Sequence, residues 1–168
     1  MAGSWPAGSW QALTVIAGIG IDIVDIARLD AALLRTPGLA ARLFTAAERE
    51  AAAVRSAPVA SLAGCFAAKE ALAKALGAPA GLRWTDAEVV RERAGRPRMR
   101  VSGTVAAEAS RQRVGAWHVS LSHDGGLCVA VVVAERAERS EPGGSAGGQD
   151  ALGMRSCKGG KVGERGEG

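Results

Sequence analysis

The chain has 168 residues, 48% of them hydrophobic, and a formal net charge of +4, a length and composition that suit one compact domain. Residues 137 to 168 hold five basic and five acidic side chains, so the positive excess lies in the body of the chain and favours anionic partners. With two Phe, four Trp, no Tyr and no basic block, the sequence points away from nucleic acid and toward a phosphorylated small molecule or an acidic protein.

The two ends of the chain differ in composition from its middle. Residues 1 to 14 repeat the motif G-S-W and have no amphipathic pattern, which predicts a disordered N-terminal extension. Residues 137 to 168 are rich in Gly, Ser, Glu and Lys and are predicted to be a disordered tail, because they can bury too little apolar surface to offset chain entropy. The working domain is therefore expected to span residues 15 to 136.

The first predicted element is a buried strand over residues 15 to 24, built of β-branched residues and glycines. A helix is expected to begin near Asp25. Its apolar face leaves Arg28 and Arg35 on the opposite side, and that apolar face consists of Ile26, Leu29 and Leu33.

The sequence predicts two further helices. Thr45 and Glu48 match a capping box, which predicts the start of the second helix, and Pro58 is expected to end it. The third helix is predicted over residues 61 to 76 and stops at Gly77.

The rest of the domain alternates strands with one helix. Residues 85 to 93 and 97 to 101 are predicted to form a hairpin, and a helix follows over 104 to 113. Two more strands are expected at 117 to 123 and 127 to 134, the second almost wholly aliphatic and therefore central in a sheet. The sum is an α+β domain.

Two carboxylates stand where the pattern predicts burial. Asp22 interrupts the apolar run of residues 15 to 24, and Glu70 lies in an otherwise apolar helix. Ionised carboxylates are costly in such places unless a cation neutralises them. We therefore expect Asp22 and Glu70 to meet around Mg²⁺, with Lys74 nearby to hold an anion that also contacts the metal.

Each of these residues also has a purely structural explanation. Asp22 could stabilise the first turn of the following helix, and Glu70 with Lys74 could form an exposed i,i+4 pair. His123 and Asp124 stand at a strand end before two glycines, where ligand contacts are common but where Asp also favours a tight turn.

Several common sites are excluded. The stretch G-I-G-I-D at 18 to 22 lacks the third glycine of a dinucleotide fingerprint, so Gly18 and Gly20 are interpreted as positions over which another element packs closely. The chain has no G-x-S-x-G motif, which argues against a nucleophile elbow.

The cysteines and the apolar runs predict the compartment. The three cysteines are widely spaced and form no C-x-x-C pair, so neither a disulfide framework nor a zinc site is indicated. The first apolar run ends at Asp22, short of the ~18 residues needed to span a bilayer. We expect a cytoplasmic protein with no membrane segment.

Three motifs lie in order and at suitable separations: G-I-G-I-D-I-V-D-I-A-R-L, then F-A-A-K-E-A-L-A-K-A-L-G, then W-H-V-S-L-S-H-D. Over about residues 15 to 136 the chain resembles the holo-[acyl-carrier-protein] synthases, the short trimeric type of 4′-phosphopantetheinyl transferase. The resemblance implies that superfamily's fold, in which a mixed antiparallel sheet packs with helices. It also implies transfer of the phosphopantetheine group of coenzyme A to a serine of apo acyl carrier protein, with release of adenosine 3′,5′-bisphosphate.

The resemblance implies roles for the acidic residues and for one lysine. Asp22 and Glu70 would bind Mg²⁺, in agreement with their unusual positions in the sequence. Glu70 acting through a water is the preferred general base, with Asp22 next. Lys74 would neutralise phosphate oxygens.

The resemblance also assigns the contacts with substrates. Lys69, Lys74 and His123 are expected to contact coenzyme A, and Asp124 would either complete the metal shell or orient His123. The basic helix that carries Arg28 and Arg35 would bind the acyl carrier protein, and the active enzyme would be a homotrimer with each active site between subunits.

One position departs from the pattern of the family. Many relatives have Arg directly before F-A-A-K-E, where it contacts a phosphate of coenzyme A, whereas this chain has Cys65. Either His123, Lys69 or another Arg supplies that charge, or the affinity for coenzyme A is reduced. A non-catalytic module that binds coenzyme A or a carrier protein is the alternative function.

Overall fold

The computed structural model describes residues 15–92 and 95–137. The predicted N-terminal extension and the predicted tail beyond Ala137 lie outside the described residues. Within them, three antiparallel strands form the main sheet in the order β1, β5, β4, and they span Ile16–Asp25 (β1), Val114–Asp124 (β4) and Leu127–Arg136 (β5). The aliphatic β5 is central, as its sequence predicts, so β1 and β4 are the two edges.

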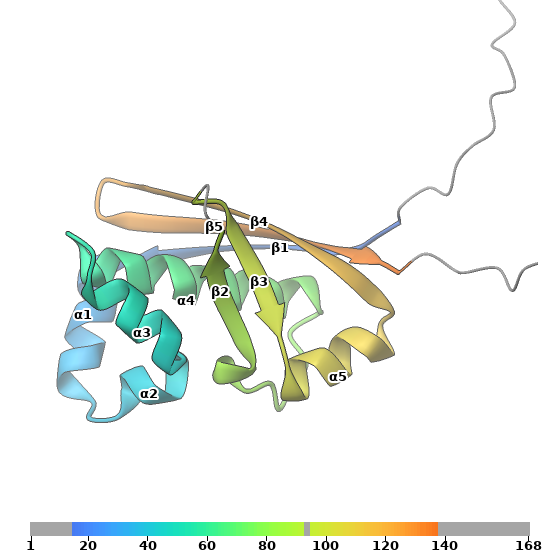
Figure 1. Cartoon of the computed structure of the whole chain (residues 1–168), viewed down its shortest axis with the longest axis horizontal. Coiled ribbons are helices and arrows are strands. Elements are labelled where there is room, and N and C mark those ends of the chain that lie inside the picture. The colour runs from blue at the N-terminus through green and yellow to red at the C-terminus, as the bar shows by residue number, and fades with distance from the viewer. Residues whose placement is uncertain (1–14, 93–94, 138–168) are drawn as a thin grey trace, which may run out of the picture. The chain divides into compact units, whose positions relative to one another are not determined.

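One long helix, α4, packs beneath this sheet, against β1 and β5 (Figure 1). Three shorter helices lie at one end of α4, and a two-stranded antiparallel hairpin packs beside β4. The elements in chain order are α1 (Ile26–Arg35), α2 (Leu39–Leu43), α3 (Ala46–Ala53), α4 (Pro58–Ala75), the 3₁₀ turn η1 (Trp84–Asp86), β2 (Ala87–Arg91), β3 (Pro97–Val101) and α5 (Gly103–Arg111). The predicted α+β architecture in one domain is confirmed.

Close packing of α4 on β1 depends on two glycines. A Cβ atom at Gly18 would collide with the carbonyl oxygen of Ala75, and one at Gly20 would collide with that of Ala71. The facing positions of the helix are alanines, so both surfaces are small and the backbones approach closely. The interpretation of Gly18 and Gly20 as a close-packing site is confirmed, and it brings the polar residues of β1 next to those of α4.

The helices differ from the sequence prediction in two respects. Pro58 begins α4 instead of merely ending the helix before it, because a proline needs no backbone N–H partner in the first turn of a helix. The five-residue helix α2 has no counterpart in the prediction, and Gly38 precedes it in the left-handed conformation. The capping box of Thr45 and Glu48 at the start of α3 is confirmed by both of its hydrogen bonds.

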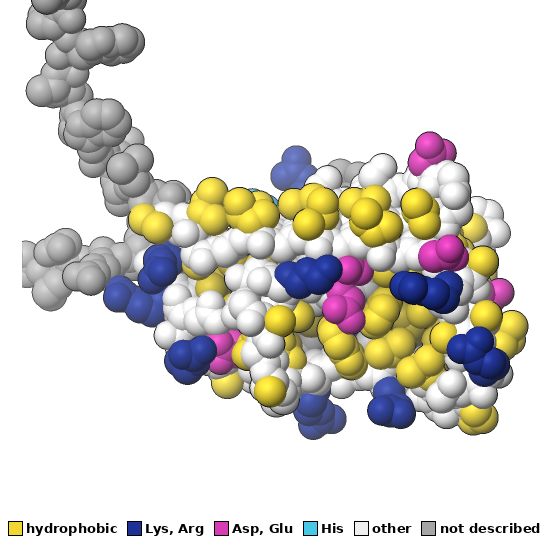
Figure 2. Space-filling model, turned by 180° about the vertical axis from the view of Figure 1, so that it is seen from behind, with side chains coloured by type: hydrophobic (Ala, Val, Ile, Leu, Met, Phe, Trp, Pro, Cys, Tyr) yellow, Lys and Arg dark blue, Asp and Glu magenta, His cyan; other side chains and the backbone are white. Residues whose placement is uncertain are grey.

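The outer face of the main sheet is apolar and exposed in the single chain. In β1 the isoleucines alternate with the residues that face α4, and Ile19, Ile21 and Ile23 are each more than half exposed. They pair in register with Val133, Val131 and Val129 of β5. Figure 2 shows a row of hydrophobic side chains along the upper edge of the molecule, over this sheet. The prediction that β1 is buried is therefore wrong for this face of a single chain, because no helix or strand of the described residues covers it.

Among the helices of the described part of the chain, none combines the length and the apolar character that crossing a membrane requires.

Candidate active site

A cluster of two carboxylates and one lysine lies where α4 crosses β1. Asp22 points from β1 toward α4, which carries Glu70 and, one turn later, Lys74. The Lys74 ammonium donates a hydrogen bond of 2.7 Å to Asp22 Oδ1 and another of 3.0 Å to the carbonyl oxygen of Ile21. The structure thus brings Asp22, Glu70 and Lys74 together, although Asp22 and Glu70 are 48 positions apart in the sequence.

The electrostatics of the cluster show that the two carboxylates interact. Partial burial raises the pKa of Glu70, the negative charge of Asp22 raises it further, and Lys74 opposes the rise. The hydrogen bond to Asp22 is the largest cause of a raised pKa at Lys74. A single lysine therefore neutralises one carboxylate of the pair and leaves the other under like-charge repulsion.

The donor set suits a hard divalent cation. Among the described residues no group of three or more His, Cys, Asp or Glu side chains gathers into a metal site. Mg²⁺ usually takes only one or two carboxylates in a protein and completes its shell with water and substrate phosphates. Two carboxylate groups that repel each other beside open solvent fit that requirement.

The structural explanations for these residues do not account for their contacts. Asp25, not Asp22, caps helix α1, and its Oδ1 accepts a hydrogen bond of 2.9 Å from the backbone N–H of Arg28. The ion pair of Lys74 is formed with Asp22 on the neighbouring strand and not with Glu70 on its own helix.

Lys69 has a structural environment that does not fit contact with a substrate. Its side chain is buried, with 1% of the residue exposed. The ammonium donates to Glu48 Oε2 at 2.7 Å, and its other two acceptors are the carbonyl oxygens of Leu43 at 2.7 Å and Trp84 at 3.0 Å. With all three donors engaged, Lys69 ties α4 to α2, α3 and η1, and we leave it out of the coenzyme A site.

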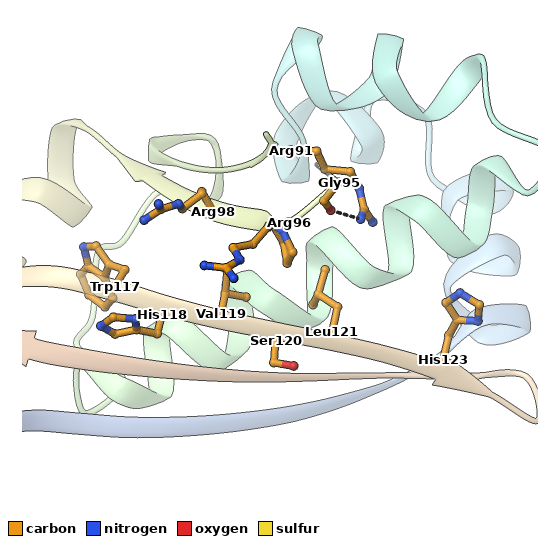
Figure 3. Close-up of a pocket in the computed structure, with 11 residues that line it drawn as sticks. Arg91, Gly95, Arg96, Arg98, Trp117, His118, Val119, Ser120, Leu121 and His123 are labelled. Atoms are coloured by element: carbon orange, nitrogen blue, oxygen red, sulfur yellow. Dashed lines mark hydrogen bonds between the residues drawn. The ribbon is translucent and has the colours of Figure 1, made fainter. Parts of the chain in front are cut away.

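A basic cleft of about 550 Å³ lies at the β4 edge of the sheet, between β4 and the end of the β2–β3 hairpin (Figure 3). We call it the arginine cleft; its lining includes Arg91, Arg96, Arg98, Trp117 and His123. The sequence prediction placed His123 at a ligand site but missed the arginines. The high density of Arg between residues 91 and 98 was the available signal, and it became interpretable only when the hairpin was seen to pack beside β4.

The two remaining candidates near the strand ends have different environments. Asp124 is exposed at the β4–β5 turn, where Gly125 and Gly126 adopt positive φ angles of 54° and 81°, so the turn explains its presence. His118 does not act with His123; its Nε2 lies 2.9 Å from Glu135 Oε2.

In one chain the carboxylate cluster and the arginine cleft belong to opposite edges of the sheet. Asp22 pairs with Ala130 of β5, and Ala130 pairs in turn with Leu121 of β4. Two strand spacings, about 10 Å, therefore separate β1 from β4. None of Asp22, Glu70 and Lys74 lines the cleft, and among the described residues Asp124 on β4 does not join the carboxylate pair of its own chain.

Arg28 and Arg35 are both exposed on α1, whose opposite face buries Leu29. Neither forms an ion pair with another described residue. Their placement on the solvent side of the helix agrees with the prediction.

Comparison with known proteins gives a consistent result. The sequence profile of the 4′-phosphopantetheinyl transferase superfamily matches residues 18–132. The chain is 62% identical over 120 residues to a holo-[acyl-carrier-protein] synthase of Streptomyces coelicolor, covering 71% of this chain and 98% of that relative. It is 60% identical over 121 residues to one of Streptomyces griseus, covering 72% of this chain and 99% of the relative.

Solved structures share the fold. The holo-[acyl-carrier-protein] synthase of Helicobacter pylori in complex with coenzyme A superposes with a TM-score of 0.61 at 31% sequence identity, covering 69% of this chain and 98% of that one. These matches include all three motifs of the sequence and the strands and helices that carry them. The chain therefore belongs to the holo-[acyl-carrier-protein] synthases of the 4′-phosphopantetheinyl transferase superfamily.

Proposed function

We propose that this protein transfers the 4′-phosphopantetheine group of coenzyme A to a serine of apo acyl carrier protein and releases adenosine 3′,5′-bisphosphate. The observation that carries the proposal is the carboxylate pair of Asp22 and Glu70 with Lys74 beside it. Membership of the holo-[acyl-carrier-protein] synthases supports the same reaction.

Asp22 and Glu70 would hold Mg²⁺ in this account. When bound, the metal supplies charge withdrawal from the phosphorus under attack and from the leaving phosphate oxygen. Lys74 would exchange its contact with Asp22 for the same phosphate oxygens, so that a charge-assisted hydrogen bond is kept throughout.

Glu70 is our candidate for the general base. The serine hydroxyl of the carrier attacks the phosphorus that bears the pantetheine arm, and the bond from that phosphorus to the bridging oxygen breaks, so the pair of electrons leaves with adenosine 3′,5′-bisphosphate. The serine proton passes to Glu70 through a water. Lys74 cannot take this role, because its hydrogen bond to Asp22 raises its pKa and keeps it protonated, so the bases in the cluster are the two carboxylates.

We propose that the working unit is a homotrimer with each active site between two copies. Two observations support this. The carboxylate cluster and the arginine cleft occupy opposite edges of one sheet. The apolar outer face of the sheet is exposed in a single chain, and an exposed apolar patch of this kind is typical of a protein–protein interface. Coenzyme A would reach from the cleft of one copy to the carboxylates of another. The free thiols Cys65 and Cys128 support a reducing compartment, the cytoplasm.

Ile21→Asp tests the assembly. A charged group at the centre of the apolar face would be buried in the interface, at a cost of several kcal/mol for each copy. We expect the variant to sediment as a folded monomer where the unaltered chain sediments at three times its own mass. Val54→Asp, which introduces the same charge at an exposed site after α3, is the control and should leave the mass unchanged. An Ile21→Asp protein that still sediments as a trimer would remove the sheet face from the interface.

Arg28→Glu tests the docking of the carrier. Charge reversal on the solvent face of α1 removes an attraction for an acidic partner and adds a repulsion. We expect the KM for apo acyl carrier protein to rise about tenfold, equivalent to ~1.4 kcal/mol, with the KM for coenzyme A unchanged. The control is Arg49→Glu on the exposed side of α3. Equal changes in both KM values would take Arg28 out of the docking surface.

Mass spectrometry tests the reaction itself. The full chain is incubated with Mg²⁺, coenzyme A and a panel of apo carrier proteins, and the carriers are weighed before and after. Addition of one phosphopantetheine group to at least one carrier is expected. Binding of coenzyme A without any gain in carrier mass would instead identify a non-catalytic binding module.

A further inference from the structure

The contact between α4 and β1 leaves the rotation of the helix about its own axis weakly determined. Gly18 and Gly20 lie against the backbone of Ala71 and Ala75, so this contact is built from glycines and methyl groups. Packed helices are held in one orientation when ridges of larger side chains enter grooves on their neighbour, and this surface offers few such ridges. Apolar packing therefore brings α4 close to β1 but does little to fix how far the helix is turned.

The rotation of α4 decides where Glu70 points. Glu70 forms neither an ion pair nor a side-chain hydrogen bond with another described residue, so no contact of its own directs it toward Asp22. A helix with its side chains has a radius of about 5–6 Å, so a rotation of about 10° moves a carboxylate on its surface by about 1 Å. Mg²⁺ requires near-ideal octahedral geometry with oxygens at about 2.0–2.1 Å, so a displacement of that size would disturb the proposed metal site.

The residue before Glu70 supplies the directional contacts that the apolar surface lacks. Among the large side chains of α4, only Lys69 and Leu72 are fully buried, with 1% of each residue exposed. The Lys69 ammonium donates three hydrogen bonds, to the end of α2, to α3 and to the start of η1. Hydrogen bonds weaken steeply when they bend, and a buried donor that loses its acceptor is costly. Three such bonds to three separate elements therefore resist rotation of the helix.

The charged acceptor of Lys69 is itself held in place. The carboxylate of Glu48 is buried and also accepts hydrogen bonds from the backbone N–H groups of Thr45 and Val89, both of 2.9 Å. These bonds connect it to the start of α3 and to β2. Lys69 is therefore bound to a fixed point of the domain and not to a mobile side chain.

We propose that Lys69 is a positioning residue for the carboxylate cluster: its hydrogen bonds fix the rotation of α4 and so hold Glu70 beside Asp22. Successive residues of a helix are about 100° apart, so Lys69 can face α3 while Glu70 faces β1. Lys69 touches neither substrate nor metal in this role. The inference rests on the proposed function for the metal but not for the approach of the two carboxylates.

The test compares the unaltered chain with the double variant Lys69→Met, Glu48→Gln, which keeps the buried volume and leaves no unpaired charge. In each background, Asp22→Asn and Glu70→Gln are introduced singly and together, and urea unfolding at one protein concentration gives the coupling energy between the two carboxylates. We expect a clear coupling in the unaltered chain, because like charges in one cluster repel. The coupling should be smaller in the double variant, where α4 is free to turn.

Metal binding provides the second measurement. Electron paramagnetic resonance follows Mn²⁺ binding to both proteins without coenzyme A, and the Kd of the double variant should be about tenfold to a hundredfold higher, the range for loss of a group that orients a metal ligand. Without any divalent cation, both proteins should bind coenzyme A equally. Val105→Ala, at a buried site on α5, is the control. It should lower the melting temperature and change neither the coupling nor the Kd for Mn²⁺, whereas a merely structural Lys69 would give the same result as this control.

An equal coupling of Asp22 and Glu70 in both backgrounds, or no coupling in the unaltered chain, would overturn the positioning role. A coupling that shrinks in the double variant, in a protein that binds Mn²⁺ no better than Glu70→Gln does, would keep the positioning role and reject the proposed metal site. Tight Mn²⁺ binding that depends on Glu70 but is the same in both backgrounds, with equal couplings, would keep the metal site and reject the positioning role.

Discussion

Glu70→Gln is expected to lower kcat/KM by on the order of 10³-fold or more, because it removes a general base and a metal ligand in one step. The amide keeps the shape of the side chain, so the fold should persist. Its thermal stability at pH 7 should equal or exceed that of the unaltered chain, since burial and Asp22 both penalise the ionised form of Glu70.

The pH dependence of this stability difference has a defined sign. A carboxyl group whose pKa is raised in the folded state costs stability above that pKa and nothing once it is protonated. The advantage of Glu70→Gln in melting temperature should therefore shrink as the pH falls through the raised pKa of Glu70. Glu50→Gln, at an exposed site on α3, is the matched control and should alter neither activity nor stability. Normal turnover by Glu70→Gln at saturating Mg²⁺ would refute the assignment.

Lys69→Met is expected to lower the free energy of unfolding by about 3–5 kcal/mol, because it leaves the carboxylate of Glu48 buried without a counter-charge. Glu48 would keep its hydrogen bonds from the backbone N–H groups of Thr45 and Val89, which limits the loss but does not neutralise the charge. Urea unfolding measures the effect.

A second substitution separates the charge from the packing. Adding Glu48→Gln to Lys69→Met removes the unpaired charge and should recover part of the lost stability. In addition, Lys69→Met should bind coenzyme A normally under conditions where it is folded. Equal stability of the single and double variants would contradict the ion-pair explanation, and a specific loss of coenzyme A affinity would return Lys69 to the substrate site.

The contrast between Lys69 and Lys74 shows what the sequence could not predict. Helix α4 is apolar around most of its circumference, so no amphipathic pattern distinguishes the side that faces α3 from the side that faces β1. Asp22 and Glu70 were predictable because a charge in an apolar run requires a partner. The partner of Lys69 depends on where α2, α3 and η1 pack, and that is a tertiary property.

The environment of strand β1 was also only partly predictable from the sequence. Its apolar sequence correctly predicts a strand, but alternation alone does not reveal whether a face is covered by the same chain or by another copy. Local sequence signals predicted the structure more reliably. The capping box of Thr45 and Glu48 correctly predicted the start of α3, and the glycines of β1 correctly predicted close packing of another element. The arginine cleft depends on tertiary structure, because the β2–β3 hairpin and β4 that line it meet only in the folded domain.

Asp22 and Glu70 are proposed to bind one divalent cation together. A crystal structure of the full chain with coenzyme A and Mn²⁺ in place of Mg²⁺, with data collected for the anomalous signal of manganese, tests it most directly. We expect one strong anomalous peak within coordinating distance of a carboxylate oxygen from each residue and of a phosphate oxygen of coenzyme A. A peak bound elsewhere, or bound by phosphate oxygens with neither carboxylate in contact, would contradict it.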